Sequence, residues 1–200
     1  MKIGYVFECG PDGGDMKVLK HLTSIIEPAA EFAYATLSVK TTLLQESGKE
    51  VKRLRNAGCE KIFIVWDLFP AWRADKGKPC RHEDKEAIKA SLTAEGLTEN
   101  DVIFLCLEEE LEAWLIADGR VLTEYFSKPH RKVDIDNVSK PDKTKDPKGK
   151  LMGHFKAHKH IQYEGTIHAE QIIKRIQNFQ KLKKSETFSR FHFKLKGVNP

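Results

Sequence analysis

The sequence predicts an α/β protein whose mostly parallel sheet lies between helices, followed by a basic helical extension. Short apolar runs typical of buried strands alternate with amphipathic, helix-like segments as far as Gly119. Beyond that residue the sequence becomes rich in lysine and its pattern is helical. We therefore expect residues 1–127 to form the α/β domain, and residues 128–200 to form a basic loop and helices packed on it.

The first 68 residues predict three strands and two helices. Apolar residues at helical spacing indicate a helix over residues 16–26, which Pro28 ends. Residues 61–68 contain five consecutive apolar residues, as expected for a strand that is covered on both faces. The other elements expected in this part are strands over residues 2–8 and 31–38 and a helix over residues 41–57.

The same alternation continues in the second half of the α/β domain. A buried strand is expected over residues 101–107, and helices over residues 83–95, 109–117 and 121–126. Residues 129–150 are polar and rich in lysine, which favours a loop. Three further helices are expected over residues 151–160, 169–182 and 186–195.

Acidic residues follow three of the predicted strands. Glu8 ends the first strand, Asp67 ends the central one, and Glu108 begins a run of three glutamates after the fourth. Parallel strands bring their carboxyl ends to one edge, which is where open α/β sheets place their sites. Carboxylates gathered there suit a hard divalent cation, so we expect Mg²⁺ or Mn²⁺.

Three more acidic residues lie close to this edge in the sequence. Asp12 and Asp15 stand in a glycine-rich turn after Glu8, and either can fold back over the same site. The alternative for Asp15 is a role as the cap of the helix that it begins. Glu112 is expected one helical turn beyond Glu108, beside the metal; the alternative is an exposed position on a surface helix.

Charge is distributed unevenly along the chain. Residues 1–127 carry 16 Lys or Arg and 22 Asp or Glu, whereas residues 128–200 carry 18 and 7. This asymmetry favours a metal site in the first part and phosphate binding in the second, although a solvated lysine-rich surface is the alternative. The residues expected to contact nucleic acid are Lys143, Lys145, Lys148, Lys150, His154 and Lys156.

His154 and His158 are four residues apart, so a helix would place both on one face. That spacing allows a helical metal pair, but the sequence offers no further ligand for zinc, and a basic face toward phosphate is favoured. The four cysteines are widely spaced and contain no C-x-x-C pair, which argues against a disulfide framework or a cysteine zinc site.

Several classes of protein are not expected. No apolar run approaches the length of a membrane span. The N-terminal residues lack the apolar stretch and cleavage site of a signal peptide. We therefore expect a cytoplasmic protein without a membrane partner.

The chain resembles the small stand-alone TOPRIM-like proteins of bacteria and archaea, which are related to the nuclease half of OLD-family proteins and to RloB-type proteins. The resemblance covers nearly the whole chain. The strings that carry it are Val6-Phe7-Glu8-Cys9-Gly10-Pro11-Asp12-Gly13-Gly14-Asp15, Ile64-Val65-Trp66-Asp67, Glu110-Leu111-Glu112-Ala113-Trp114-Leu115-Ile116-Ala117-Asp118, His168-Ala169-Glu170-Gln171-Ile172-Ile173 and Ser185-Glu186-Thr187-Phe188-Ser189-Arg190-Phe191.

This resemblance implies a TOPRIM fold with a four-stranded, mostly parallel sheet. It also implies a divalent metal held by a Glu after the first strand and by an Asp-x-Asp pair after a later one. Glu8 matches the Glu and Asp67 matches the first Asp, but Phe69 stands where the second Asp is expected.

Two functions follow as expectations. The first is a metal-dependent nuclease, of phage defence or of a mobile element, acting on DNA or RNA. Its catalytic residues would be Glu8, Asp67, Glu112 and Lys150. The second is a non-catalytic protein that binds nucleic acid or a partner protein on the same scaffold, which the missing Asp at position 69 favours.

Overall fold

The computed structural model describes residues 1–69, 78–107 and 111–197. Its centre is a four-stranded sheet with strand order β2-β1-β3-β4, in which every neighbouring pair is parallel. The strands are β1 (Lys2–Phe7), β2 (Glu31–Thr36), β3 (Lys61–Asp67) and β4 (Ile103–Leu107). The predicted α/β fold is confirmed, and so is the expectation that the strands ending near Glu8, Asp67 and Leu107 are parallel neighbours.

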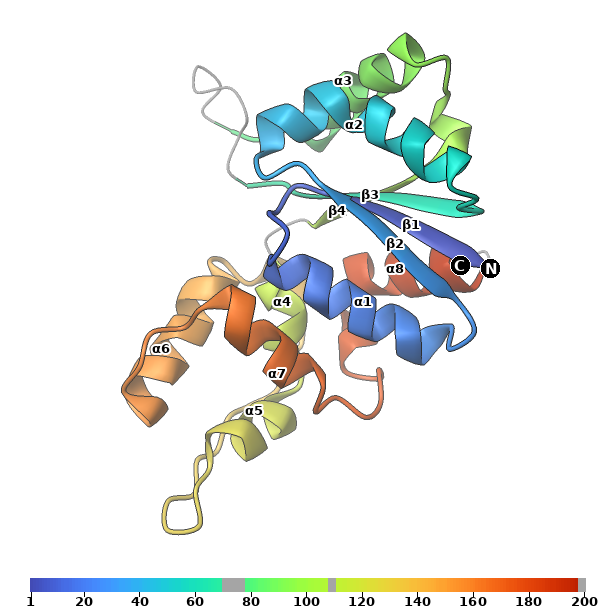
Figure 1. Cartoon of the computed structure of the whole chain (residues 1–200). Helices are drawn as coiled ribbons and strands as arrows, with labels where there is room; N and C mark the ends of the chain where they lie inside the picture. Colours follow the sequence, from blue (N-terminus) through green and yellow to red (C-terminus); the bar gives the residue numbers. More distant parts are fainter. Residues whose placement is uncertain (70–77, 108–110, 198–200) are drawn as a thin grey trace.

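Helices cover both faces of the sheet (Figure 1). One face carries α2 (Lys40–Asn56) and α3 (Arg81–Ala94), and the other carries α1 (Gly14–Ile26) and α8 (Glu186–Lys196). Because side chains alternate along a strand, each central strand contributes apolar residues to both layers. In β3, for example, Val65 packs in the cluster under α1 and α8, and the next residue, Trp66, packs in the cluster under α2 and α3.

The remaining helices lie beyond α1 on the same side of the sheet (Figure 1). They are α4 (Glu112–Leu115), α5 (Gly119–Phe126), α6 (Pro147–Lys159) and α7 (Glu170–Ile173), with short helical turns η2 (Pro141–Lys143), η3 (Gly165–Ala169) and η4 (Leu182–Lys184). A further short turn, η1 (Glu99–Asp101), lies on the other face beside α3, where Glu99 pairs with Lys85 and Lys89. Within the described ranges, no helix is long and apolar enough to cross a membrane.

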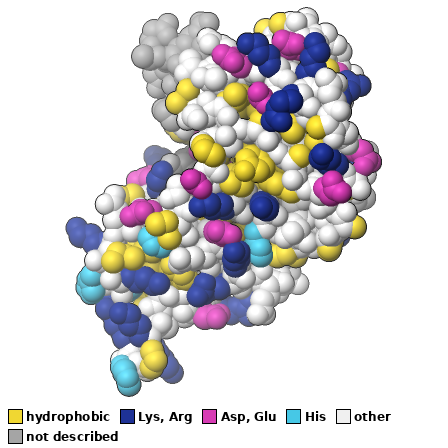
Figure 2. All heavy atoms as spheres, in the orientation of Figure 1, with side chains coloured by type: hydrophobic (Ala, Val, Ile, Leu, Met, Phe, Trp, Pro, Cys, Tyr) yellow, Lys and Arg dark blue, Asp and Glu magenta, His cyan; other side chains and the backbone are white. Residues whose placement is uncertain are grey.

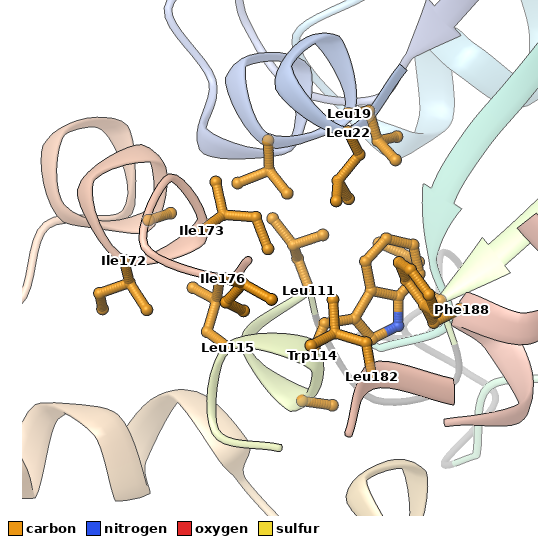
Figure 3. Packing of buried hydrophobic residues seen from close by; sticks show 14 of the residues in the cluster. Leu19, Leu22, Leu111, Trp114, Leu115, Ile172, Ile173, Ile176, Leu182 and Phe188 are labelled. Atoms are coloured by element: carbon orange, nitrogen blue, oxygen red, sulfur yellow. The ribbon is translucent and has the colours of Figure 1, made fainter. Parts of the chain in front are cut away.

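The C-terminal helix α8 packs in the apolar core on one face of the sheet. The ring centroids of Phe191 and Phe63 are 5.8 Å apart, which joins α8 to β3. The indole nitrogen of Trp114 donates to the Thr187 hydroxyl at 2.9 Å, and its ring meets Phe188 edge to face. Figure 3 shows the same cluster receiving side chains from α1, α4, α7 and α8. The buried cluster therefore includes residues from both sides of position 127, and the division there stays a prediction.

Two predicted helices are shorter than expected. The helix expected over residues 169–182 ends at Ile173. After it, Ile176 and Leu182 are buried in the core. Between them, Asn178 closes a turn by accepting from the Gln180 N–H. The helix expected over residues 109–117 is only α4, and residues 108–110 lie outside the described part.

A buried ion pair fastens the end of β3 to both helices above it. The Lys40 ammonium lies 3.0 Å from Oδ2 of Asp84, and the two side chains are only 7% and 1% exposed. The same ammonium donates to the backbone carbonyls of Asp67 and Leu68, at 2.9 and 2.7 Å. Oδ2 of Asp84 also accepts from the indole nitrogen of Trp66 at 3.1 Å. One lysine from α2 and one aspartate from α3 thus fix both helices to the end of β3.

Replacing Asp84 with Asn should destabilise the protein by about 3 kcal/mol, because it leaves the Lys40 charge buried without its counter-charge. Urea unfolding gives the value. The double variant Lys40→Met/Asp84→Asn should lose less than the sum of the two single variants, since no charge is then left buried. Additive losses would show that the two side chains do not stabilise each other.

Candidate functional site

Acidic side chains gather in a hollow of about 460 Å³ beyond the carboxyl ends of β1 and β3. The hollow is lined by the turn after β1, the end of β3, the start of α4, the first turn of α6 and the turn η3. Its charged lining residues are Asp12, Asp15, Asp67, Glu112 and Lys148. Four predicted acids and one predicted lysine are thus brought together from segments far apart in the sequence. We call this place the acidic hollow.

Two glycines allow the turn after β1 to form one wall of the acidic hollow. A Cβ on Gly14 would lie 2.7 Å from the Gly165 carbonyl oxygen, and one on Gly13 would lie 2.2 Å from the Cys9 sulfur. A side chain at position 14 would therefore push the turn away from η3, and one at position 13 would clash within the turn itself. Lys17 also joins α1 to η3, since its ammonium donates to the Thr166 carbonyl at 2.7 Å.

Asp15 stands in the first turn of α1, but it is not the N-cap residue. That position belongs to Gly13, which has no side chain to cap the helix. The Asp15 carboxylate still interacts favourably with the positive end of the helix dipole. It also lines the acidic hollow. Asp15 is therefore not the cap, but its place in the first turn of α1 is compatible with a place in the acidic hollow.

Glu8 binds the end of the neighbouring strand. Its Oε2 accepts from the Asp67 backbone N–H at 3.1 Å, so the side chain of Glu8 lies beside Asp67 as predicted. Burial raises the pKa of Glu8, whereas the Asp67 N–H and the Lys40 charge oppose this rise and Asp84 adds to it. Among the described residues, Glu8 is not one of those that line the acidic hollow. Its hydrogen bond holds the backbone of Asp67, which does line the hollow.

Glu112 faces inward. It is 8% exposed, and its Oε1 accepts from the Tyr163 hydroxyl at 3.0 Å. The alternative of an exposed surface glutamate is wrong. Sequence reasoning missed Tyr163, because one tyrosine in a polar connection gives no signal that its hydroxyl will meet a carboxylate.

The electrostatic field in the acidic hollow is negative. Burial, together with the nearby Asp15 and Asp67 carboxylates, raises the pKa of the Cys9 thiol to about 12. The thiol therefore stays protonated at neutral pH and cannot act as a nucleophile. A site of this charge needs a cation before it can accept a phosphate.

The predicted basic residues divide into two groups. Lys148 lines the acidic hollow, whereas Lys150, predicted as catalytic, is exposed two residues further along α6 and does not line it in the described structure. Lys143, Lys145 and Lys156 are exposed as well. Figure 2 shows Lys and Arg side chains grouped over the lower part of the molecule, where α5 and α6 lie.

His154 packs against an aromatic ring. Its centroid lies 6.0 Å from that of Phe126 and 5.9 Å from that of His158, whose plane is nearly parallel. Burial lowers the pKa of His154, and the charges of His158 and Lys150 lower it further. His154 is therefore mainly neutral at pH 7, and it can donate a hydrogen bond to phosphate but adds little charge.

The residues of the acidic hollow fit a hard cation in part. Among the described residues, no group of three or more His, Cys, Asp or Glu side chains is arranged to hold a metal ion. Mg²⁺ and Mn²⁺ sites commonly use one or two carboxylates and keep several waters, a requirement that the acids of this hollow meet. The predicted ligand Glu108 lies outside the described residues.

The raised pKa of Glu8 predicts how stability depends on pH. The folded protein holds this proton at pH values where the unfolded chain has lost it, so stability falls as the pH rises from the ordinary value of 4.5 through the raised one. Glu8→Gln removes this pH-dependent loss of stability, because the amide does not ionise. The Gln side chain can still accept from the Asp67 N–H. In metal-free buffer the variant should gain stability relative to wild type between pH 4 and pH 7.

Urea unfolding at several pH values measures this difference. Glu124→Gln, an exposed site on α5, is the control and should show no such trend. A Glu8→Gln protein that loses stability relative to wild type as the pH rises would show that the Glu8 charge stabilises the metal-free fold.

Comparison with known proteins places the chain in one family. No curated protein and no solved structure matches it. Residues 13–196 match the family described as Domain of unknown function (DUF4276). That match says nothing of TOPRIM, OLD-family or RloB-type proteins, and the resemblance to them stays a prediction. Because the match spans most of the described core and the acidic hollow, the chain belongs to the DUF4276 family.

Proposed function

We propose that this protein is a Mg²⁺- or Mn²⁺-dependent nuclease that hydrolyses phosphodiester bonds at the acidic hollow. The observation that supports the proposal best is the composition of that hollow. Asp12, Asp15, Asp67 and Glu112 come from three separate segments to the carboxyl edge of a parallel sheet, and Lys148 joins them. Carboxylates with one lysine suit a cation and a phosphate bound side by side.

The residues take different roles in this proposal. Asp15 and Asp67 would hold the cation, and Asp12, which is exposed, would bind its waters. When bound, the cation neutralises the phosphate and lowers the pKa of an attacking water. Lys148 binds a phosphate oxygen. The hydrogen bond from Tyr163 occupies Oε1 of Glu112, which orients Oε2 to accept a proton from the water.

The basic part of the chain supplies attraction to the substrate. Residues 128–200 hold 18 of the 34 Lys and Arg residues, and Lys148 at the start of α6 connects this part to the acidic hollow. The TOPRIM-like resemblance supports the same chemistry and a role in phage defence or a mobile element in the cytoplasm.

A second candidate function is binding without cleavage, to nucleic acid or to a partner protein. Phe69 supports it: the side chain is 47% exposed and stands where the resemblance expects a second metal-binding Asp. The lack of a three-ligand group within the described residues supports it as well.

Glu112→Gln should lower the rate of cleavage at least about 100-fold while the protein stays folded. Proton transfer by a positioned side chain typically contributes a factor of at least this size to the rate. Asp67→Asn should raise the Mn²⁺ concentration needed for activity. The assay incubates purified protein with plasmid, linear DNA and RNA across a Mn²⁺ series. Glu124→Gln is the control, and the melting temperature of each variant checks the fold.

Two outcomes would contradict the nuclease proposal or the role of Glu112 in it. Full activity in Glu112→Gln would remove this residue from catalysis. No cleavage by wild type with any substrate or metal, together with intact binding, would favour the non-catalytic function.

Lys148→Gln should weaken nucleic-acid binding more than Lys150→Gln, because only Lys148 lines the acidic hollow. The slope of log affinity against log salt should fall by roughly 0.9 for a duplex if Lys148 contacts one phosphate. Fluorescence anisotropy at several salt concentrations measures the slope. Equal effects of the two substitutions would show that the lysines act only as general surface charge.

A further inference from the structure

An open groove of about 530 Å³ lies between α6 and the segment that follows it. Figure 1 shows the chain turning at the end of α6 and running back toward α7. The apolar wall of the groove comes from Met152 on α6 and from Ile161 and Tyr163 after it. Met152 and Ile161 are 40% and 48% exposed, so the groove presents apolar surface to the solvent. We call this place the α6 groove. Its volume falls within the range of ligand pockets, about 300–1,000 Å³.

The polar side chains of the α6 groove are available to a ligand. Lys156 and His160 line it and are exposed, and none of its lining residues is acidic. Within the described ranges, neither of these two side chains takes part in a hydrogen bond or an ion pair. Lys159 differs, since its ammonium lies 3.7 Å from the centroid of the Tyr125 ring. The groove therefore suits a ligand that has both an apolar surface and a negative charge.

Two residues of the α6 groove do not suit their places in the helix. Gly153 is in the interior of α6, where glycine lowers helix stability, yet a Cβ there would meet nothing within 4 Å. His160 is the C-cap of α6 and has a φ of 59°, a conformation that favours glycine. Packing explains neither residue. A ligand explains both, because Gly153 leaves the groove open and His160 places a ring on its rim.

The α6 groove adjoins the acidic hollow. Lys148 lines the hollow, and Met152 and Lys156 follow at intervals of four residues, so the three side chains share one face of α6. The rise along the helix axis from Lys148 to Lys156 is about 12 Å. Tyr163 also connects the two places, since it lines the groove and its hydroxyl donates to Glu112 in the hollow. A strand with one phosphate at the acidic hollow can therefore continue into the groove.

From this arrangement we infer that the α6 groove binds an unpaired nucleotide of the substrate, which makes the substrate single-stranded nucleic acid. The base lies against Met152 and Ile161 and stacks on His160. Lys156 binds its phosphate. The bases of a duplex are paired and stacked, so they cannot enter such a groove unless they are flipped out. The inference rests on the proposed function, which places the scissile phosphate at the acidic hollow.

Fluorescence anisotropy in the presence of EDTA tests the inference, since no metal-dependent cleavage then occurs. Wild type should bind a single-stranded oligonucleotide more tightly than the duplex of the same sequence. Gly153→Leu should fill the groove and weaken single-strand binding by about tenfold, as expected for the loss of one bound base, without changing duplex binding. Ala157→Leu is the matched control, because it adds the same side chain at an exposed position of α6 that does not line the groove.

His160→Gly separates the role of the ring from the stability of the fold. Glycine suits the positive φ, so the variant should melt at the same temperature as wild type or higher. Its affinity for the single strand should nevertheless fall at least about fivefold, because base–aromatic stacking contributes at least that factor. His160→Phe keeps an aromatic ring and should bind the single strand as wild type does.

Lys156→Gln tests the phosphate contact. The slope of log affinity against log salt should fall by roughly 0.7 for the single strand, the contribution of one phosphate. Lys150→Gln is the control, since Lys150 is exposed on the same helix but does not line the groove.

Two results would overturn the inference. One is that the duplex binds as tightly as the single strand. The other is that Gly153→Leu binds the single strand no more weakly than Ala157→Leu, in proteins that are both folded. Cleavage assays with Mn²⁺ distinguish this failure from failure of the proposed function. Groove-dependent binding without any cleavage would end the nuclease proposal but leave the nucleotide in the groove. Cleavage that Gly153→Leu does not affect on single strands would keep the nuclease and exclude the groove.

Discussion

The end of β3 is held by the buried ion pair between Lys40 and Asp84. Its lysine holds the carbonyls of Asp67 and Leu68, and its aspartate holds the indole of Trp66. Asp67 lines the acidic hollow, and Trp66 packs in the cluster under α2 and α3. The pair of charges thus holds the backbone at Asp67 and the side chain of the preceding residue, Trp66, which points to the opposite face. A buried ion pair is a costly way to gain stability, so its use here is better explained by the positions that it fixes.

The parts of the structure that follow from local patterns could be predicted from the sequence. Unbroken apolar runs identified β3 and β4, and the parallel arrangement then placed Glu8 beside Asp67. The buried ion pair was missed, although a signal for it exists. Asp84 lies in the apolar stripe of α3, four residues before the buried Ile88, and a charged residue in such a stripe must meet a partner.

Errors in the C-terminal part came from helix boundaries. The predicted start at Leu151 made Lys150 the entry to a helix, whereas α6 begins at Pro147 with Asp146 as its N-cap. An acidic N-cap residue followed by proline is a known signal for the start of a helix. Applied to Asp146 and Pro147, it would have placed Lys148 in the first turn of the helix. The pairing of Tyr163 with Glu112 had no such signal, since it joins residues 51 positions apart through tertiary packing.

In the proposed nuclease, Phe69 sets a limit to the affinity for metal. The TOPRIM-like resemblance expects a second carboxylate at that position, so a cation at Asp67 would lose one direct ligand and keep a water in its place. Asp15 and Glu112 reach the same hollow from other segments, and Asp15 together with Asp67 adds to the rise that burial causes in the pKa of Cys9. Charge without close-fitting geometry attracts a cation but holds it loosely. The proposed nuclease would then work with a metal that exchanges readily and binds most firmly when a phosphate supplies the missing oxygen.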